Sequence, residues 1–196
     1  MIDVEDVFKV FQQHRGNAVV VPVGTSGRRW QDFSNNENRD LNLGGAMGHA
    51  TSAALGVALS LPNEKIVMFD AEGALLMNLG ILATIADKQP QNFYHFLLDN
   101  ECYATTGGQP VPNAKNINYA GMAKEAGYAA AYQFDDLESL SRQIEEILSQ
   151  EGPVFVAIKV VPQVENEPIG RRKRRPVRSR AVTVQALQKE LGIADD

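Results

Sequence analysis

Two pairs of residues in this sequence carry side chains suited to binding a hard cation. Glu72 is followed by Gly73, and Asp99 is followed by Asn100, with residues 74–98 between them, enough for one helix and one strand. Each pair follows a run predicted as a buried strand, and open α/β sheets bind ligands at the carboxyl ends of their strands. A carboxylate and a carboxamide at one such edge suit Mg²⁺, which can in turn hold a diphosphate. The spacing therefore predicts a cation site with an anionic ligand.

The elements that must position these pairs alternate along the chain between strands and helices. Short apolar runs predict strands over 18–23, 66–69, 93–98, 129–132 and 154–160. Apolar residues at helical spacing predict helices up to about residue 14 and over 45–61, 75–86, 118–126 and 137–148. This alternation favours an α/β fold with a doubly wound, mainly parallel sheet and helices on both faces.

The helix predicted over 45–61 carries small residues on the face expected to meet the sheet. These residues are Ala50, Ala53, Ala54, Val57 and Ala58, and their size predicts close packing. The preceding segment, 24–45, has no clear periodicity and is too long for a simple connection, which makes it a candidate functional loop.

Composition changes near the end of the chain and suggests two parts. Residues 1–161 are expected to form a single domain, and 162–196 a basic C-terminal arm with a short helix over 182–191. Seven basic residues crowd one ten-residue stretch of this arm: Arg171, Arg172, Lys173, Arg174, Arg175, Arg178 and Arg180. Such a tract is usually a solvated arm. It could also reach a partner subunit or place an arginine near an anionic substrate, a task for which Arg28 and Arg29 are the other candidates.

Overall composition narrows the classes of function. The 196 residues carry a net charge of −5, so nucleic acid is not expected as a partner of the whole chain. The single cysteine, Cys102, excludes an internal disulfide and a cysteine-based zinc cluster. The N-terminus is too acidic for a targeting peptide, and no apolar run approaches the ~20 residues of a membrane span. We therefore expect a cytoplasmic protein without a membrane partner.

The altered signature around Glu72 and Asp99 is similar to the diphosphate-binding signature of thiamine diphosphate enzymes. In that signature Gly-Asp-Gly precedes a spacer of this length and a pair of asparagines, whereas Ala71, Glu72 and Asp99 stand at three of those positions here. Three further stretches, GAMGHATSAALGVAL (45–59), EGALLMNLGILATIA (72–86) and TTGGQP (105–110), resemble the pyrophosphate-binding domain of phosphonopyruvate and sulfopyruvate decarboxylases. The resemblance covers roughly 18–160 and implies a thiamine diphosphate-binding fold.

The resemblance implies roles for individual residues in holding the cofactor. Glu72 and Asn100 would bind Mg²⁺ through their side chains, and Cys102 through its backbone carbonyl. Backbone N–H groups of Gly73 and Ala74 would meet the diphosphate, and the Gly45 carbonyl would accept from the exocyclic amine of the cofactor. The cofactor-binding set would comprise Gly45, Ala46, Met47, Gly48, Ala71, Gly73, Ala74, Asn100, Cys102 and Tyr103.

Four residues would lie close to the reacting atoms. Met47 would prop the bent cofactor, His49 would contact cofactor or substrate, and Thr105 and Thr106 would line the loop beside the thiazolium. Purely structural roles remain open for two of these residues, because Met47 could be an ordinary core residue and His49 a structural histidine. His95 is expected to be a packed strand residue, Asp99 an acceptor that orders its loop rather than a metal ligand, and the Cys102 thiol is not expected to act as a nucleophile.

In the family, a second domain binds the aminopyrimidine ring and supplies a glutamate that activates the cofactor. A chain of 196 residues has room for the pyrophosphate-binding domain only. We therefore expect an α subunit with the pyrimidine-binding domain and that glutamate, and a hetero-oligomer of α₂β₂ type or larger. This chain would be the β subunit and would need its partner for activity.

The activity implied is decarboxylation of a small 2-oxo acid with a second anionic group, of the sulfopyruvate or phosphonopyruvate type. The products would be CO₂ and an aldehyde. Two alternatives stay open: a thiamine diphosphate-dependent carboligase subunit similar to acetolactate synthase, and a degenerate partner domain without catalysis. The altered Ala71–Glu72 and Asp99 are the reason for the second alternative.

Overall fold

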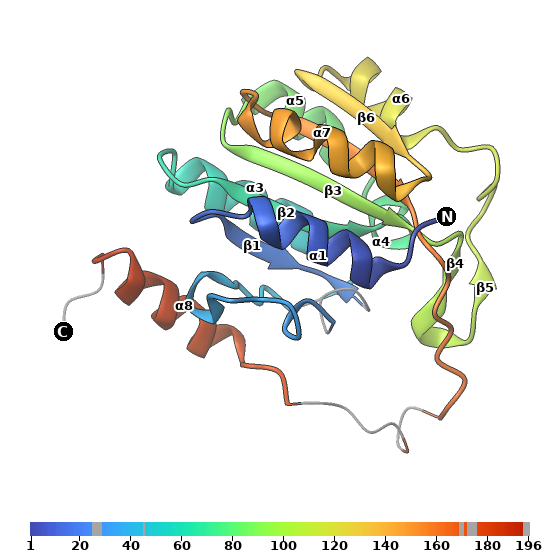
Figure 1. The fold of residues 1–196 in the computed structure, drawn as a ribbon, viewed down its shortest axis with the longest axis horizontal. Helices are drawn as coiled ribbons and strands as arrows, with labels where there is room; N and C mark the ends of the chain where they lie inside the picture. The colour runs from blue at the N-terminus through green and yellow to red at the C-terminus, as the bar shows by residue number, and fades with distance from the viewer. Residues whose placement is uncertain (25–28, 45, 169–170, 172–175, 194–196) are drawn as a thin grey trace.

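A five-stranded parallel sheet forms the centre of the molecule (Figure 1). The computed structural model describes residues 1–24, 29–44, 46–168, 171 and 176–193. In spatial order the strands are β1 (Val19–Pro22), β2 (Ile66–Ala71), β3 (Phe93–Asp99), β7 (Val154–Lys159) and β6 (Ala130–Phe134). All four neighbouring pairs run parallel. The predicted α/β fold with a parallel sheet is therefore confirmed.

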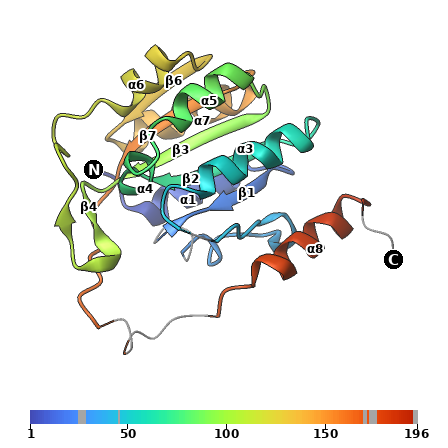
Figure 2. The same ribbon diagram turned by 180° about the vertical axis from the view of Figure 1, so that it is seen from behind.

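Helices cover both faces of the sheet, because alternate residues of each strand point to opposite sides. On one face α1 (Val4–His14) packs beside α7 (Leu137–Ser149), over strand residues such as Val67 and Phe69. On the other face lie α3 (Ala50–Ser60), α5 (Ile81–Lys88) and α6 (Tyr119–Ala126), over residues such as Ile66 and Met68 (Figure 2). Two separate apolar cores result, one for each face of the sheet.

The prediction of a single helix over 75–86 is wrong, because the chain forms two helices there. α4 spans Glu72–Leu76, α5 begins at Ile81, and a turn at 77–80 separates them. The Asn78 side-chain amide donates to the Gly48 carbonyl oxygen at 2.9 Å and to the Ser52 hydroxyl at 3.3 Å. These contacts hold the turn against the residues that precede and begin α3.

The helix predicted over 45–61 begins later, and its buried face differs from the expected one. α3 starts at Ala50 and buries Ala50, Thr51, Ala54, Leu55 and Ala58. Ala53 is exposed, so the prediction for it was wrong, whereas Val57 is partly buried and packs against this core as expected. Thr51 takes a place on the buried face because its hydroxyl donates to Asp70 Oδ2 at 2.8 Å.

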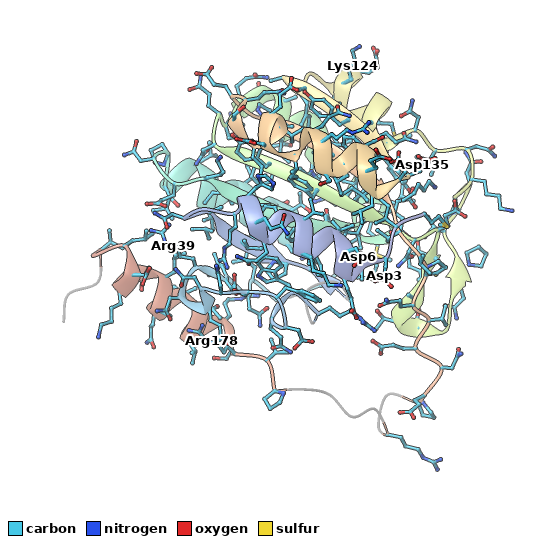
Figure 3. All side chains as sticks on the ribbon, viewed as in Figure 1. Asp3, Asp6, Arg39, Lys124, Asp135 and Arg178 are labelled. Atoms are coloured by element: carbon cyan, nitrogen blue, oxygen red, sulfur yellow. The ribbon has the colours of Figure 1, made fainter. Side chains whose placement is uncertain are left out.

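The C-terminal arm folds back along the β1 edge of the sheet. The predicted terminal helix is α8 (Arg180–Glu190), which lies against the short helix η1 (Glu37–Arg39). Figure 3 shows Arg39 and Arg178 where the two helices meet. Arg39 pairs with Glu64 at 2.6 Å and lies 3.7 Å from Glu190. Four residues of the basic tract, 172–175, lie outside the described residues.

A small antiparallel hairpin follows the central strand β3. β4 (Cys102–Tyr103) pairs with β5 (Gln109–Pro110), and the short helix η2 (Ala104–Thr106) joins them. No helix among the described residues is long and apolar enough to cross a membrane.

Candidate functional site

A cavity of about 260 Å³ opens at the carboxyl edge of the sheet, beside the ends of β1, β2 and β3. This is the edge at which open α/β sheets bind ligands. Glu72 and Asn100, from the two pairs of the predicted cation site, both contribute to its wall. The wall is formed by Val23, Gly24, Met47, Ala71, Glu72, Gly73, Ala74, Asn100, Cys102, Tyr103, Ala104, Thr105 and Thr106.

A buried polar network fixes the end of β2, immediately before Glu72. The Asp70 carboxylate is fully buried and accepts the Ala71 N–H at 2.8 Å and the Thr51 hydroxyl at 2.8 Å. His95 Nε2 lies 3.1 Å from Asp70 Oδ2, and its Nδ1 lies 3.2 Å from the Tyr128 hydroxyl. Buried polar groups that find all their partners hold one arrangement firmly. His95 is therefore a packed strand residue, as expected, and the network holds the turn that carries Glu72.

Glu72 is a carboxylate held out of water without a partner. Only 1% of the residue is exposed, and neither carboxylate oxygen accepts a hydrogen bond within the described part of the chain. Burial raises the pKa of Glu72 to about 7, and the negative charge of Asp99 adds to the rise. Backbone N–H groups of Glu72, Asn100 and Cys102 oppose the rise without reaching hydrogen-bond geometry. A buried, unpaired carboxylate of this kind calls for a cation or a proton.

The replacement Glu72→Gln is expected to raise the free energy of unfolding by up to about 3 kcal/mol at pH 8 without divalent cations. The carboxyl has a pKa of 4.5 in the unfolded chain and about 7 in the folded one, so the unfolded chain ionises first as the pH rises. Stability is therefore lost between these values, and the amide avoids the loss. Urea unfolding of both proteins at about pH 4 and about pH 8 measures the effect. A gain for the variant that is equal at both pH values would contradict this explanation.

The loop after β3 turns sharply and presents Asn100 and Cys102 to the cavity. Glu101, between them, has a left-handed backbone with φ of +65°. Asp99 Oδ1 accepts the Glu101 N–H at 3.2 Å, and Asn100 Oδ1 accepts the Cys102 N–H at 3.0 Å. Lys159, at the end of β7, pairs with both Asp99 and Glu101. Asp99 thus orders the loop, while Asn100 keeps a second lone pair on its amide oxygen for a ligand.

Gly73 and Gly48 are required by close packing around the cavity. A Cβ atom on Gly73 would lie 2.6 Å from Tyr103 Cε1, so only glycine lets the tyrosine ring rest on the start of α4. Gly48 has φ of +82°, and a Cβ atom there would lie 3.2 Å from the Ala74 oxygen and from the Met77 Cβ. The turn at Gly48 therefore packs directly on α4. Its neighbour Met47 lies in the cavity wall with 48% of its surface exposed.

Some residues of the predicted site lie away from the cavity wall. Ala46, Gly48 and His49 do not line it, and His49 is exposed at the start of α3. Gly45 lies outside the described residues, so its expected carbonyl contact has no structural counterpart. Thr105 and Thr106 do line the cavity.

Of the two arginines proposed for substrate recognition, Arg29 does not line this cavity. Arg28 lies outside the described residues. Arg29 pairs with Glu5 and lines a separate small cavity of about 40 Å³, on whose wall Ala71 and Asn100 also lie.

Several residues at the site were not predicted. Val23 lines the cavity from the end of β1 beside Gly24, the first residue of the predicted functional loop, and the rule that ligands bind at carboxyl ends of strands would have found Val23. Tyr119 has a buried hydroxyl without a hydrogen-bond partner in the described structure. Its pKa is raised by burial and by the charges of Asp99 and Glu72, which locates it close to the site. No sequence pattern pointed to Tyr119.

The residues present fit a divalent cation that carries an anionic ligand. Glu72 and Asn100 belong to one cavity wall and carry hard oxygen donors, and the Glu72 carboxylate oxygens accept no hydrogen bond in the described structure. Within the described ranges no group of three or more His, Cys, Asp and Glu side chains could hold a metal alone. The remaining ligands would have to be carbonyl, water or ligand oxygens, as is usual for Mg²⁺ bound with a phosphate group.

The fold and the site define a class of protein: an α/β domain with a cavity, and a buried unpaired carboxylate in its wall, at the carboxyl edge of its parallel sheet in the described structure. The family model of the thiamine pyrophosphate enzyme C-terminal TPP binding domain matches residues 23–158. The chain belongs to this family.

Curated relatives narrow the kind of enzyme. The chain is 40% identical over 125 residues to the sulfopyruvate decarboxylase subunit beta of Methanothermobacter thermautotrophicus, covering 64% of each chain. It is 30% identical over 164 residues to the same subunit of Methanococcus maripaludis, covering 83% of this chain and 86% of the relative. It is 34% identical to the phosphonopyruvate decarboxylase of Streptomyces viridochromogenes over 142 residues, 71% of this chain but only 35% of that relative. The relatives therefore support a thiamine diphosphate-dependent decarboxylase subunit.

Solved structures agree on the fold. A thiamin diphosphate-dependent enzyme from Mycobacterium smegmatis superposes with a TM-score of 0.70 at 19% identity, over 83% of this chain and 32% of that one. The benzoylformate decarboxylase of Polynucleobacter necessarius gives 0.66 at 18% identity, over 81% and 33%. At this identity the likeness establishes the thiamine diphosphate-binding fold alone.

Proposed function

We propose that this chain is the cofactor-binding subunit of a Mg²⁺- and thiamine diphosphate-dependent decarboxylase of a small 2-oxo acid. The observation that carries the proposal is the buried Glu72 carboxylate, which has no partner within the described structure and lies in a cavity wall with Asn100. A carboxylate in that state is stable only if a cation or a proton neutralises it. The family supports thiamine diphosphate as the ligand, and we propose that Mg²⁺ bound to its diphosphate neutralises Glu72.

The proposal gives the residues at the cavity separate roles in binding the metal and the cofactor. Glu72 and Asn100 bind Mg²⁺ through side-chain oxygens, and Cys102 adds its backbone carbonyl. Gly73 and Ala74 offer backbone N–H groups to the diphosphate. The remaining cofactor contacts come from the glycine turn at 45–48, with Met47 as the apolar support, and from Ala71 and Tyr103.

Thiamine diphosphate, when bound, supplies an electron sink for the carbon–carbon bond that breaks as CO₂ leaves. The chain itself binds and orients. Thr105 and Thr106 offer hydroxyls at the hairpin side of the cavity, and Ala71, Ala74 and Ala104 keep the wall apolar and low in water. His49 is proposed to reach substrate or cofactor from the exposed start of α3.

We propose that the substrate carries a second anionic group, as sulfopyruvate and phosphonopyruvate do. Support comes from the names of the decarboxylase relatives, which span both substrate types. The competing carboligase activity has more distant support, at 26% identity to the acetolactate synthase isozyme 1 large subunit of Escherichia coli over 22% of that chain.

The proposal includes a partner chain that covers the cavity and supplies the pyrimidine-binding domain with its activating glutamate. Two exposed apolar side chains lie at the glycine turn. Met47, within the turn, is 48% exposed, and Met77, which packs against Gly48, is 56% exposed. We propose that the partner chain covers these exposed apolar side chains, because contiguous apolar surface is a common protein contact. We further propose a cytoplasmic α₂β₂ or larger assembly, with residues 1–161 as the cofactor domain and 162–196 as an arm.

An assay of CO₂ release tests the proposed activity. The chain is combined with a candidate pyrimidine-binding chain encoded by a neighbouring reading frame, with Mg²⁺ and thiamine diphosphate. Sulfopyruvate or phosphonopyruvate is expected to yield CO₂ and the corresponding aldehyde. Pyruvate with a 2-oxo acid acceptor serves as the comparison, and a ligated hydroxy-oxo acid as the main product would support the carboligase instead.

A further inference from the structure

Lys159 binds two carboxylates of the loop that carries Asn100 and Cys102. Its Nζ lies 2.8 Å from Asp99 Oδ2 and 2.9 Å from Glu101 Oε1. The Lys159 side chain is 19% exposed and that of Asp99 3% exposed, so water screens this pair weakly. Glu72, a third carboxylate, has no hydrogen-bond partner among the described residues. Lys159 thus pairs with two carboxylates and offsets one of their two negative charges, whereas Glu72 has no such partner among the described residues.

The same lysine fixes the turn between two proposed metal ligands. Glu101 stands between Asn100 and Cys102 with a left-handed backbone, and its N–H donates to Asp99 Oδ1 at 3.2 Å. Its carbonyl accepts the Val111 N–H at 3.0 Å. Since Lys159 holds both the Asp99 and the Glu101 side chains, it closes this turn from the end of β7.

Without the lysine, the loop would offer a second place for a divalent cation. Asp99 Oδ2 and Glu101 Oε1 both lie within 3 Å of the position that Nζ takes, so a divalent cation at that position would reach both carboxylates. Two converging carboxylates attract Mg²⁺ or Mn²⁺ more strongly than one carboxylate and one amide.

We propose that Lys159 is a positioning residue that assigns the divalent cation to Glu72 and Asn100 by occupying Asp99 and Glu101. This inference rests on the proposed function, because it presupposes a metal site at Glu72. It goes beyond that function in naming the residue that decides which carboxylate the metal takes. Residues that orient metal ligands typically change metal affinity by ~10–100-fold when replaced.

The test is a double-mutant cycle on the full chain, with Mn²⁺ alone as the probe and electron paramagnetic resonance as the readout. The proteins are wild type, Glu72→Gln, Lys159→Met and the double variant. In the wild-type background Glu72→Gln is expected to weaken Mn²⁺ binding at least ~10-fold. In the Lys159→Met background the same replacement is expected to have less than about a threefold effect, because Asp99 and Glu101 then hold the ion. Lys159→Gln repeats the cycle if Lys159→Met does not fold.

Two controls separate positioning from general destabilisation. Lys159→Arg keeps the charge and is expected to retain the full effect of Glu72→Gln. Lys65→Met removes a half-buried lysine at the opposite end of β2, where its Nζ donates to the Leu148 carbonyl, and is also expected to leave that effect intact.

The outcomes distinguish this inference from the proposed function. Equal weakening by Glu72→Gln in the wild-type and Lys159→Met backgrounds would overturn the role of Lys159 and leave the metal site standing. No effect of Glu72→Gln in the wild-type background would overturn both, because Glu72 would then hold no metal for Lys159 to assign.

Discussion

Replacing Glu72 with Ala is expected to abolish Mg²⁺-dependent binding of thiamine diphosphate, with a loss of affinity of at least ~100-fold. Glu72 is the one carboxylate in the described wall of the cavity, so no other side chain there can take over its charge. Without it the diphosphate would face Asn100 and backbone groups without a firmly held cation. Isothermal titration calorimetry of the assembled protein with Mg²⁺ and thiamine diphosphate measures the loss.

Glu72→Asp is the matched control for this experiment. It keeps the charge and shortens the side chain by one methylene, and it restores the residue type of the family's Gly-Asp-Gly signature. We expect it to retain most of the cofactor affinity. Unchanged affinity in Glu72→Ala would refute the assignment of Glu72 as a metal ligand and favour a degenerate domain.

The chain without a partner is expected to release CO₂ from its substrate at least ~10²–10⁴-fold more slowly than the assembled enzyme, the range typical of a missing general acid–base group. The described cavity wall holds one carboxylate, Glu72, which the proposal commits to the metal. A second acidic group to activate the cofactor ring must therefore come from elsewhere. Titrating the partner chain into a fixed amount of this chain and measuring initial rates tests the requirement.

The control for partner dependence is the partner assayed alone over the same concentrations. Activity should appear only with both chains and saturate at a fixed ratio. Equal turnover by the isolated chain and by the mixture would contradict the proposed division of the site between two polypeptides.

The sheet was predictable because its strands are continuous apolar runs between polar breaks. β3 is buried at all seven positions. Burial of every residue, without alternation between an apolar and a polar face, is typical of a central parallel strand. The two pairs Glu72–Gly73 and Asp99–Asn100 were placed together for the same reason, since parallel strands deliver their carboxyl ends to one edge.

The details that sequence missed depend on contacts between distant residues. The break between α4 and α5 is held by Asn78, whose partner Gly48 lies 30 residues earlier. The buried face of α3 follows from the bond between Thr51 and Asp70. Periodicity describes one segment at a time, so it cannot show such pairings.

The charge interactions at the site could not be predicted from the sequence either. Sequence placed Glu72 and Asn100 at the site, but not the burial that raises the pKa of Glu72 to about 7. Nor did it show that Lys159, sixty residues beyond Asp99, takes two neighbouring carboxylates. These features arise only once β2, β3 and β7 lie side by side.

A crystal structure of the assembled enzyme with thiamine diphosphate and Mn²⁺ tests the central claim most directly, because anomalous scattering locates the ion. We predict one strong anomalous peak at about 2.0–2.2 Å from a Glu72 carboxylate oxygen and the Asn100 amide oxygen, with diphosphate oxygens completing its ligands. A peak elsewhere, or cofactor bound with no metal at Glu72, would contradict the account.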